Sequence, residues 1–401
     1  MDLNPAVRRG SAFLGKNMKK VIFIGLLFWA AAASGQVVPL KAEDWVFRPG
    51  AVEFGDSVGV ARMKILSSEG HVLLRRGDFS DGTIEFDVIP TDPGFSQFDF
   101  RWQDSTESEC FYFRTTRGGG HPYVMEGVQY TPIVKGTMCW DIMAHYQGNA
   151  SFGQGAQNHV KLVISGRRML VYVNGGAGVS GGTGAPGGAR PTLDIGELEG
   201  NTTHGSIGFS GQAIISNLVL KPGKVEGLSP MAATDPTSND PRYLRHWQMT
   251  APDTLAPGVD FSYGLMPGKE TGWQPIDAER RGLINLTRKW VVNRSHQLIW
   301  LKTTIHAEEA GRYTLRLGFV DEVWLFLNGG LLYLDKNFYG QPIAKSPRGR
   351  LSLENAMVSL PLQQGDNVLM VGVGSNFYGW AIMARLDDLD GLTIERTADG
   401  R

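Results

Sequence analysis

Cysteine is scarce in this chain, with 2 among 401 residues, so a disulfide scaffold is excluded. The formal net charge is only -1, which leaves no basic field for non-specific nucleic-acid binding. No apolar run beyond the N-terminal segment approaches the ~20 residues that span a bilayer. Zinc-type H-E-x-x-H and C-x-x-C motifs and a phosphate-binding loop are also absent, so the sequence marks no metal or other cofactor.

Glycine is abundant, with 52 residues that follow no collagen-like period, so the glycines indicate turns and loops. A hydrophobic fraction of 42% is enough for sizeable cores. The length suggests two domains, at roughly 150 residues per domain.

Residues 1–35 have the pattern of a bacterial-type signal peptide. Lys19 and Lys20 precede an apolar run from Val21 to Ala33, which ends among small residues. Met18 opens a compact version of the same pattern and is an alternative start. The pattern predicts export, to the periplasm or outside the cell, and no membrane span in the mature chain.

Alternating apolar and polar residues, bounded by turn residues, recur along the rest of the chain. They predict an all-β protein with two antiparallel β-sandwich or jelly-roll domains in tandem. The expected domains are 37–222 and 259–401, joined by a Pro-rich linker and its approach at 223–258. The expected strands of the first domain are Val72 to Arg75, Gly82 to Pro90, Phe98 to Trp102, Val160 to Ile164, Met169 to Val173, Ile207 to Phe209 and Ile214 to Leu220. Those of the second are Leu298 to His306, Tyr313 to Leu317, Val323 to Leu327, Leu331 to Leu334, Val358 to Leu360, Val368 to Val373 and Ala381 to Leu386.

Three phrases of the first block, taken in order, resemble the concanavalin A-like lectin/glucanase fold, including laminin-G-like and 3-keto-disaccharide-hydrolase-like domains. They are Gly82 to Val88 (GTIEFDV), Val171 to Gly175 (VYVNG) and Gly205 to Phe209 (GSIGF). The resemblance implies a β-sandwich of a kind that often binds glycans, and it does not imply an activity.

The second block resembles the galactose-binding-like jelly roll that accompanies many glycoside hydrolases. The matching phrases are Val320 to Gly329 (VDEVWLFLNG) and Leu362 to Leu369 (LQQGDNVL). Asn328-Gly329 also suits a hairpin turn that requires positive φ. The resemblance implies a sugar-binding module.

Glu85 and Asp87 fit the first two positions of the carboxylate pattern found in retaining glucanases of the lectin/glucanase fold. The third position falls on Ile89 or Pro90, and neither can act as acid or base. We therefore expect Glu85 and Asp87 to lie on the polar face of an ordinary strand. The catalytic residues stay unknown, and the sequence leaves open whether the protein is an enzyme.

Polar and aromatic residues of the kind that bind sugars gather in two places, residues 101–146 and the loops near residues 339 and 378. Flat aromatic rings stack on sugar C–H faces, and amides, carboxylates and guanidinium groups bond to hydroxyls. The predicted ligand-binding residues are Arg101, Tyr112, Arg114, His121, Glu126, Gln129, Tyr130, Trp140, Tyr339, Asn376, Tyr378 and Trp380. The alternatives are that the first group is core and paired surface charge, and that the second is packing between domains.

Cys110 and Cys139 fall in one predicted domain of an exported protein. A disulfide between them and a pair of buried thiols are both compatible with the sequence. A structural Ca²⁺ is compatible with either fold, although no acidic loop marks a site for it.

Three functions are consistent with these features. The favoured one is a secreted protein that binds an oligo- or polysaccharide through sandwich loops and a concave face. The second is a glycoside hydrolase or 3-keto-glycoside hydrolase with its site in residues 101–146, using Glu126, His121 or Asp141. The third is a structural or adhesion module.

Overall fold

The computed structural model describes residues 35–394, apart from 92–93, 116–123, 125, 151, 154, 177–189, 257 and 293–294. The expected signal peptide, His121 and most of the Gly-rich loop at 175–188 lie outside the described residues. Within them, antiparallel strands dominate, and the helical elements are five short 3-10 turns. The turns are η1 (Ala42–Asp44), η2 (Ala144–Tyr146), η3 (Tyr263–Leu265), η4 (Arg280–Gly282) and η5 (Leu286–Arg288). The prediction of an all-β fold is confirmed.

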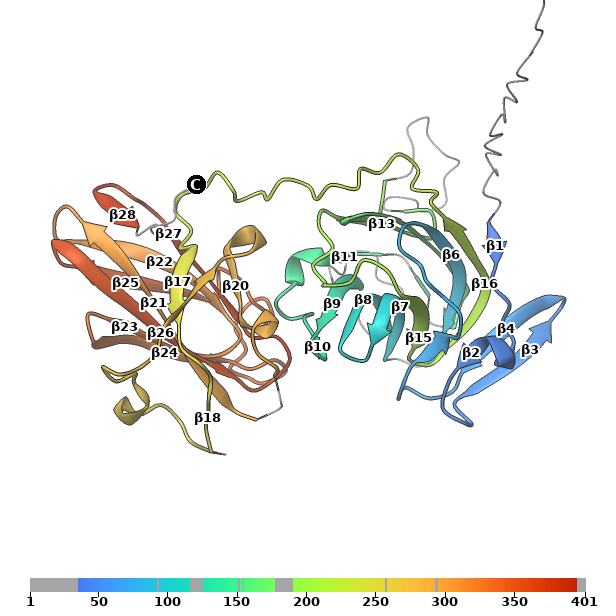
Figure 1. Ribbon diagram of the computed structural model, residues 1–401, viewed down its shortest axis with the longest axis horizontal. Helices are drawn as coiled ribbons and strands as arrows, with labels where there is room; N and C mark the ends of the chain where they lie inside the picture. Colours follow the sequence, from blue (N-terminus) through green and yellow to red (C-terminus); the bar gives the residue numbers. More distant parts are fainter. Residues whose placement is uncertain are drawn as a thin grey trace, which may run out of the picture. The chain divides into compact units, whose positions relative to one another are not determined.

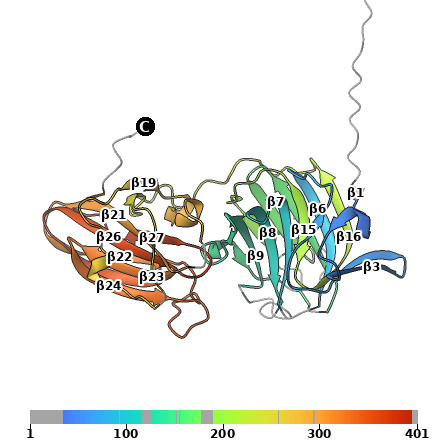
Figure 2. The same cartoon turned by 60° about the horizontal axis from the view of Figure 1, so that its bottom comes forward.

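Two antiparallel sheets face each other in the N-terminal sandwich (Figures 1 and 2). One sheet runs, in spatial order, β14 (Leu193–Ile195), β13 (Arg168–Val173), β12 (Asn158–Ser165), β6 (Gly82–Pro90), β16 (Ala213–Pro222), β4 (Val60–Ile65) and β3 (Val52–Ser57), with β1 (Gln36–Val37) on β16. The other runs β10 (Thr137–Met138), β9 (Val128–Val134), β8 (Glu107–Arg114), β7 (Phe95–Asp104), β15 (Ser206–Ser210), β5 (Val72–Leu74) and β2 (Trp45–Val46), with β11 (Gln147–Gly148) on β9.

The alternation in β6 shows why this sandwich forms. Ile84, Phe86 and Val88 are at most 2% exposed and point into the core, because successive side chains of a strand point to opposite faces. Phe86 meets Phe98 of the facing sheet at a ring-centroid distance of 5.0 Å. The polar positions of β6 lie on the opposite face, where Glu85 pairs with Lys221 at 2.7 Å. This is the ordinary polar face that the sequence predicts for Glu85.

Asp87 is more enclosed than its neighbour on that face. Its carboxylate accepts hydrogen bonds from Gln157 and Asn217, and it lies 2.8 Å from Nδ1 of His159. His159 belongs to β12 and Asn217 to β16, and Gln157 directly precedes β12, so this group ties adjacent strands of one sheet together.

The C-terminal sandwich also has two antiparallel sheets. The larger runs β19 (Gln274–Asp277), β17 (His246–Met249), β21 (Gln297–Ala307), β26 (Gly365–Ser375), β23 (Asp321–Leu327) and β24 (Gly330–Asn337), with β18 (Asp253–Thr254) and β28 (Leu392–Ile394) on β21. The smaller runs β20 (Leu283–Asn285), β27 (Ala381–Leu386), β22 (Gly311–Phe319) and β25 (Ala356–Leu362).

The hairpin between β23 and β24 turns at Asn328 and Gly329, whose φ angles are 51° and 81°. This is the positive-φ turn that the Asn-Gly pair predicts. Two short strands, β17 and β18, lie inside the stretch expected as linker, and both pair with β21. Trp247 and Met249 of β17 are 1% and 3% exposed, so their burial, together with pairing to β19 and β21, holds a strand in a Pro-rich stretch.

Residues from Ser34 onward form one compact unit. The core of the N-terminal sandwich continues into Leu283, Leu351 and Ala381 of the C-terminal one. A membrane-crossing helix, long and apolar enough for a bilayer, is not found among the described residues.

We expect Phe86→Ala to destabilise the protein by about 3–5 kcal/mol, because it leaves a cavity between the two sheets. Phe95, at the start of β7, is 57% exposed, so Phe95→Ala should cost less than about 1 kcal/mol. Urea unfolding of both variants measures the difference. Equal losses would show that Phe86 does not hold the two sheets together.

Candidate functional site

Three neighbouring strands of the larger C-terminal sheet, β23, β24 and β26, place aromatic and polar side chains at one end of the sheet. Asp321, which opens β23, is paired with Asn337 at the end of β24. The next residue of β23 is paired with Gly374, one residue before the end of β26. Because these neighbours are antiparallel, the loops that follow β24 and β26 lie at the same edge, beside Asp321.

Asp321 fixes the loop that follows β26. Its Oδ2 accepts hydrogen bonds from the backbone N–H groups of Asn376, at 2.6 Å, and Phe377, at 2.8 Å. Burial raises the pKa of Asp321 to about 7, although these two hydrogen bonds act in the opposite direction. Asn337 fixes the other loop, since its Oδ1 accepts a hydrogen bond from the N–H of Lys345 at 2.7 Å.

The two loops enclose a hollow of about 440 Å³, which we call the aromatic hollow. Its wall combines aromatic rings, amides and one carboxylate, which are the groups through which proteins bind sugars. The lining residues are Asp321, Phe338, Tyr339, Gln341, Pro342, Ile343, Asn376 and Phe377.

The aromatic rings at this hollow are ordered by one another. The rings of Tyr339 and Phe377 are nearly parallel, with centroids 6.3 Å apart and an interplanar angle of 8°. Tyr378 meets Phe377 edge-on at 4.4 Å. Phe377 and Tyr378 remain 43% and 40% exposed, so both rings are accessible to a ligand.

Trp140, from the N-terminal sandwich, packs behind these rings. Its centroid lies 4.6 Å from that of Tyr339 and 5.6 Å from that of Tyr378, both in edge-on geometry. Trp140 itself is 7% exposed. It therefore supports the hollow from behind and offers little surface to a ligand.

A buried arginine joins the same cluster. The guanidinium of Arg350, 1% exposed, lies over the rings of Trp140, at 5.3 Å, and Tyr339, at 5.6 Å. It also pairs with Oε1 of Glu126 at 3.1 Å, while Arg348 reaches the other oxygen of Glu126 at 3.3 Å. Both oxygens of Glu126 thus pair with arginines of the C-terminal sandwich.

A polar network on β8 and β9 holds the segment that carries Trp140. Gln129 donates to the carbonyl oxygens of Trp140, at 2.7 Å, and Met143, at 3.2 Å. Its Oε1 accepts hydrogen bonds from Tyr112, at 2.7 Å, and from Arg114. Since Tyr112, Arg114 and Gln129 are at most 3% exposed, they position Trp140 from within the protein.

Asp141, the next residue, joins the two sandwiches directly. The N–H of Gly379 points at its carboxylate, 3.0 Å from Oδ1 and 3.2 Å from Oδ2. A Cβ on residue 379 would lie 2.6 Å from Oδ1 of Asp141, so this approach needs glycine. Burial, and then the charge of Asp321, raise the pKa of Asp141 to about 8.

The predicted ligand-binding residues therefore divide into groups. Tyr339 and Asn376 line the aromatic hollow, and Tyr378 and Trp140 flank it. The others lie elsewhere or are enclosed. Arg101 is 3% exposed and binds Asp81 and backbone carbonyls. Tyr130 points into the core and donates to Glu109, and Trp380 is fully buried.

Sequence reasoning missed six of the eight lining residues, of which Asp321, Phe338, Gln341 and Phe377 are polar or aromatic. Two of them are in the look-alike segments Asn337-Phe338-Tyr339 and Asn376-Phe377-Tyr378, where the repeated pattern was the available signal. Asp321 carries no such signal, because its role depends on a loop 55 residues away in the sequence.

Cys110 and Cys139 are both buried and unbridged. Cys110 packs with Tyr112 and Trp140 on the outer face of β8, whereas Cys139 belongs to the core. The structure thus has two buried thiols instead of the disulfide that the sequence also allowed. Over the described ranges, no group of three or more His, Cys, Asp or Glu side chains is arranged to hold a metal ion.

No protein-family model matches the chain, and no curated protein matches it. Among solved structures, it is similar to a carbohydrate-binding module of Bacillus subtilis, with 14% identity and a TM-score of 0.30 over 44% of this chain and 93% of that one. It is also similar to the galectin LEC-6 of Caenorhabditis elegans, with 14% identity and a TM-score of 0.24 over 44% of this chain and 98% of the galectin. These values are too low to transfer a ligand or an activity to this chain.

The buried carboxyl of Asp141 predicts a pH dependence of stability. Its pKa in the folded protein, about 8, lies above the ordinary 3.8. The unfolded chain therefore loses this proton first as the pH rises. The contribution of the protonated carboxyl to the unfolding free energy is complete below about pH 3.8 and decreases steadily until about pH 8. We expect wild-type protein to lose more unfolding free energy between pH 5 and pH 8 than Asp141→Asn does. The difference should not exceed about 1.4 kcal/mol per pH unit.

Urea unfolding at pH 5 and pH 8 measures this difference. The Asn side chain can still accept the Gly379 N–H, so the variant keeps the contact but not the titration. Asp253→Asn, at an exposed position, is the matched control and should follow the wild type. Equal pH dependence in wild type and Asp141→Asn would contradict the prediction.

Proposed function

We propose that this protein binds carbohydrate, and that the aromatic hollow holds a sugar ring. The observation that carries this proposal is that one hollow of about 440 Å³ combines aromatic rings with polar groups. The exposed ring of Phe377 lies nearly parallel to that of Tyr339 in it. A sugar presents C–H groups on its faces and hydroxyls around its rim. The hollow offers aromatic rings for the C–H face of a sugar and polar side chains for its hydroxyls.

The roles of the residues follow from their exposure and chemistry. The exposed ring of Phe377 stacks on a sugar face, with Tyr378 bordering it. Asn376 and Gln341 are exposed amides, and each can donate to and accept from hydroxyls. Asp321 keeps the loop of Phe377 in place through the two N–H groups, so the hollow is formed before the ligand arrives. Such preorganisation lowers the entropic cost of binding.

Binding, rather than hydrolysis, is the function that these groups support best. A retaining glycosidase needs two carboxyl groups about 5 Å apart, flanking the scissile bond. Glu126 pairs with Arg348 and Arg350, and Asp141 is enclosed against Gly379. Neither of these carboxyl groups is free to act on a substrate. Export of the protein, as the N-terminal pattern predicts, would place the hollow among extracellular or periplasmic glycans.

Phe377→Ala tests the proposal. We expect the affinity for the best-bound neutral oligosaccharide of a soluble gluco-, galacto- and manno-oligosaccharide panel to fall about tenfold. This corresponds to about 1.4 kcal/mol of lost stacking. Titration calorimetry measures affinity, and chromatography of the same samples measures product release.

Tyr263→Ala is the matched control, because Tyr263 is 63% exposed and does not line the hollow. It should bind as the wild type does. Unchanged affinity in Phe377→Ala would exclude the aromatic hollow as the site. Absence of binding to every neutral oligosaccharide would overturn the proposal, and release of product would replace binding with hydrolysis.

A further inference from the structure

A second cavity, of about 470 Å³, lies between the two sandwiches, and we call it the arginine cleft. The N-terminal sandwich contributes His145 and its neighbours in and beside η2. The C-terminal sandwich contributes four arginines and an apolar wall. The arginines are Arg280, Arg281, Arg316 and Arg385.

The carboxylates around the arginine cleft are too few to neutralise it. Asp387 is shared, since it lies 3.1 Å from Arg316 and 3.6 Å from Arg385. Glu197 is shared as well, at 3.8 Å from Arg280 and 2.7 Å from Arg167. A single acidic residue, Glu354, is among the lining residues, and it is exposed. Asp235, beside the cleft, pairs with Arg245 at 3.6 Å. Among the lining residues themselves, four arginines face a single carboxylate.

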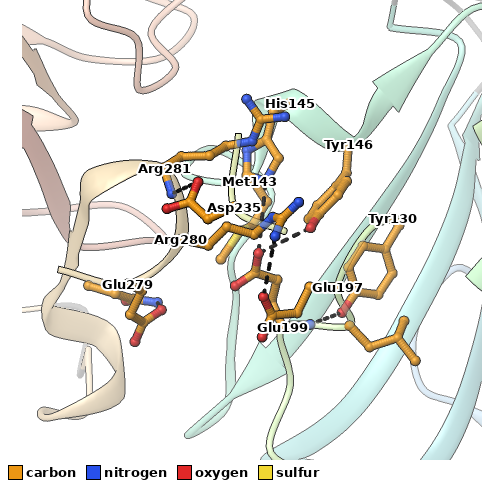
Figure 3. A network of polar contacts seen from close by, with 12 residues as sticks. Tyr130, Met143, His145, Tyr146, Glu197, Glu199, Asp235, Glu279, Arg280 and Arg281 are labelled. Carbon is orange, nitrogen blue, oxygen red and sulfur yellow. Dashed lines mark hydrogen bonds and ion pairs between the residues drawn. The ribbon is translucent and has the colours of Figure 1, made fainter. Parts of the chain in front are cut away.

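Arg281 is the arginine without a carboxylate. In the described part of the chain its side chain has no ion-pair partner, and its Nε is buried without an acceptor. Its backbone is held in the left-handed region at φ 63°, where its N–H donates to Asp235 at 3.1 Å. Figure 3 shows the Arg281 side chain extending toward His145. The backbone thus directs an uncompensated guanidinium into the cleft.

His145 adds a neutral donor beside this charge. Burial, then the charges of Arg281 and Arg280, lower the pKa of His145 to about 3. Its Nε2 is buried, lies 4.0 Å from Oε1 of Glu199 and makes no hydrogen bond to a described residue. A neutral imidazole can donate one N–H to an anion without adding charge. Leu351, Met383 and Tyr243 form the apolar part of the wall.

We propose that the arginine cleft binds the carboxylate of an acidic saccharide, a hexuronate. A guanidinium group has a planar fork that matches a carboxylate with two parallel hydrogen bonds. The apolar wall and Tyr243 suit the ring that carries the carboxylate. The choice of a saccharide rests on the proposed function, whereas the choice of an anion rests on the arginines alone.

Titration calorimetry with sodium glucuronate as the probe tests this proposal. We expect wild-type protein to bind glucuronate, and the affinity to fall with added salt. Arg281→Gln should weaken binding at least tenfold. Arg281→Lys should retain part of the affinity, since it keeps the charge and loses the fork. Arg312→Gln, at an exposed position outside the cleft, is the matched control and should bind as the wild type does.

Thermal unfolding of each variant separates loss of binding from loss of fold. A stably folded Arg281→Gln protein that binds glucuronate as tightly as the wild type overturns the proposal. Failure of the wild type to bind glucuronate also overturns it. Sodium sulfate and glucose serve as further probes. Equal affinity for sulfate and glucuronate would leave an anion site and overturn the saccharide assignment. One further outcome separates the two proposals. If no neutral oligosaccharide binds but Phe377→Ala still binds glucuronate, the proposed function is wrong and the arginine cleft remains supported as an anion site.

Discussion

The buried guanidinium of Arg350 is the constraint on which the candidate site depends. An enclosed cation is costly unless charge and hydrogen bonding compensate for it, and the penalty is several kcal/mol per ion. The compensation comes from both sandwiches, since Nη1 pairs with Glu126 and the guanidinium lies over the rings of Trp140 and Tyr339. Its Nε and Nη2 are buried without a hydrogen-bond partner among the described residues. Arg350 is therefore stable only when the two sandwiches are packed together. The same contact holds Tyr339 at the wall of the aromatic hollow.

Two surfaces of different chemistry result from this packing. The aromatic hollow is built on loops of the C-terminal sandwich and has exposed rings and amides. The arginine cleft lies between the sandwiches and is lined by four arginines and a single carboxylate. A chain that uses both could recognise a neutral sugar at one place and an acidic sugar at the other. Linking two weak sites on one molecule raises overall avidity without new contacts, provided that the ligand spans both.

Much of the fold could be predicted from the sequence, because strand alternation is a local property. The alternation of Ile84, Phe86 and Val88 with polar neighbours defines which side of β6 is buried. The Asn328-Gly329 pair likewise defines a turn from two residues alone. The position of β17 was not predictable in this way, since its Pro-rich surroundings hide a short strand that long-range pairing and the burial of Trp247 and Met249 stabilise.

The candidate site was predicted in part, for a related reason. Aromatic residues in two similar segments, around Tyr339 and Tyr378, indicated a cluster before any geometry was known. The sequence could not separate exposed rings from buried ones, so Trp380 and Tyr130 were included although both are enclosed. It also could not show that Arg114 and Gln129 face inward to hold Trp140.

The sequence by itself determined the all-β class and the residue types available to bind a sugar. Only the tertiary structure decided which of them meet. Asp321 acts on Asn376 and Phe377, and Asp141 acts on Gly379, across 55 and 238 positions of the chain. Such contacts depend on how sheets and loops pack. That packing is set by burial over the whole core, which no local pattern of residues records.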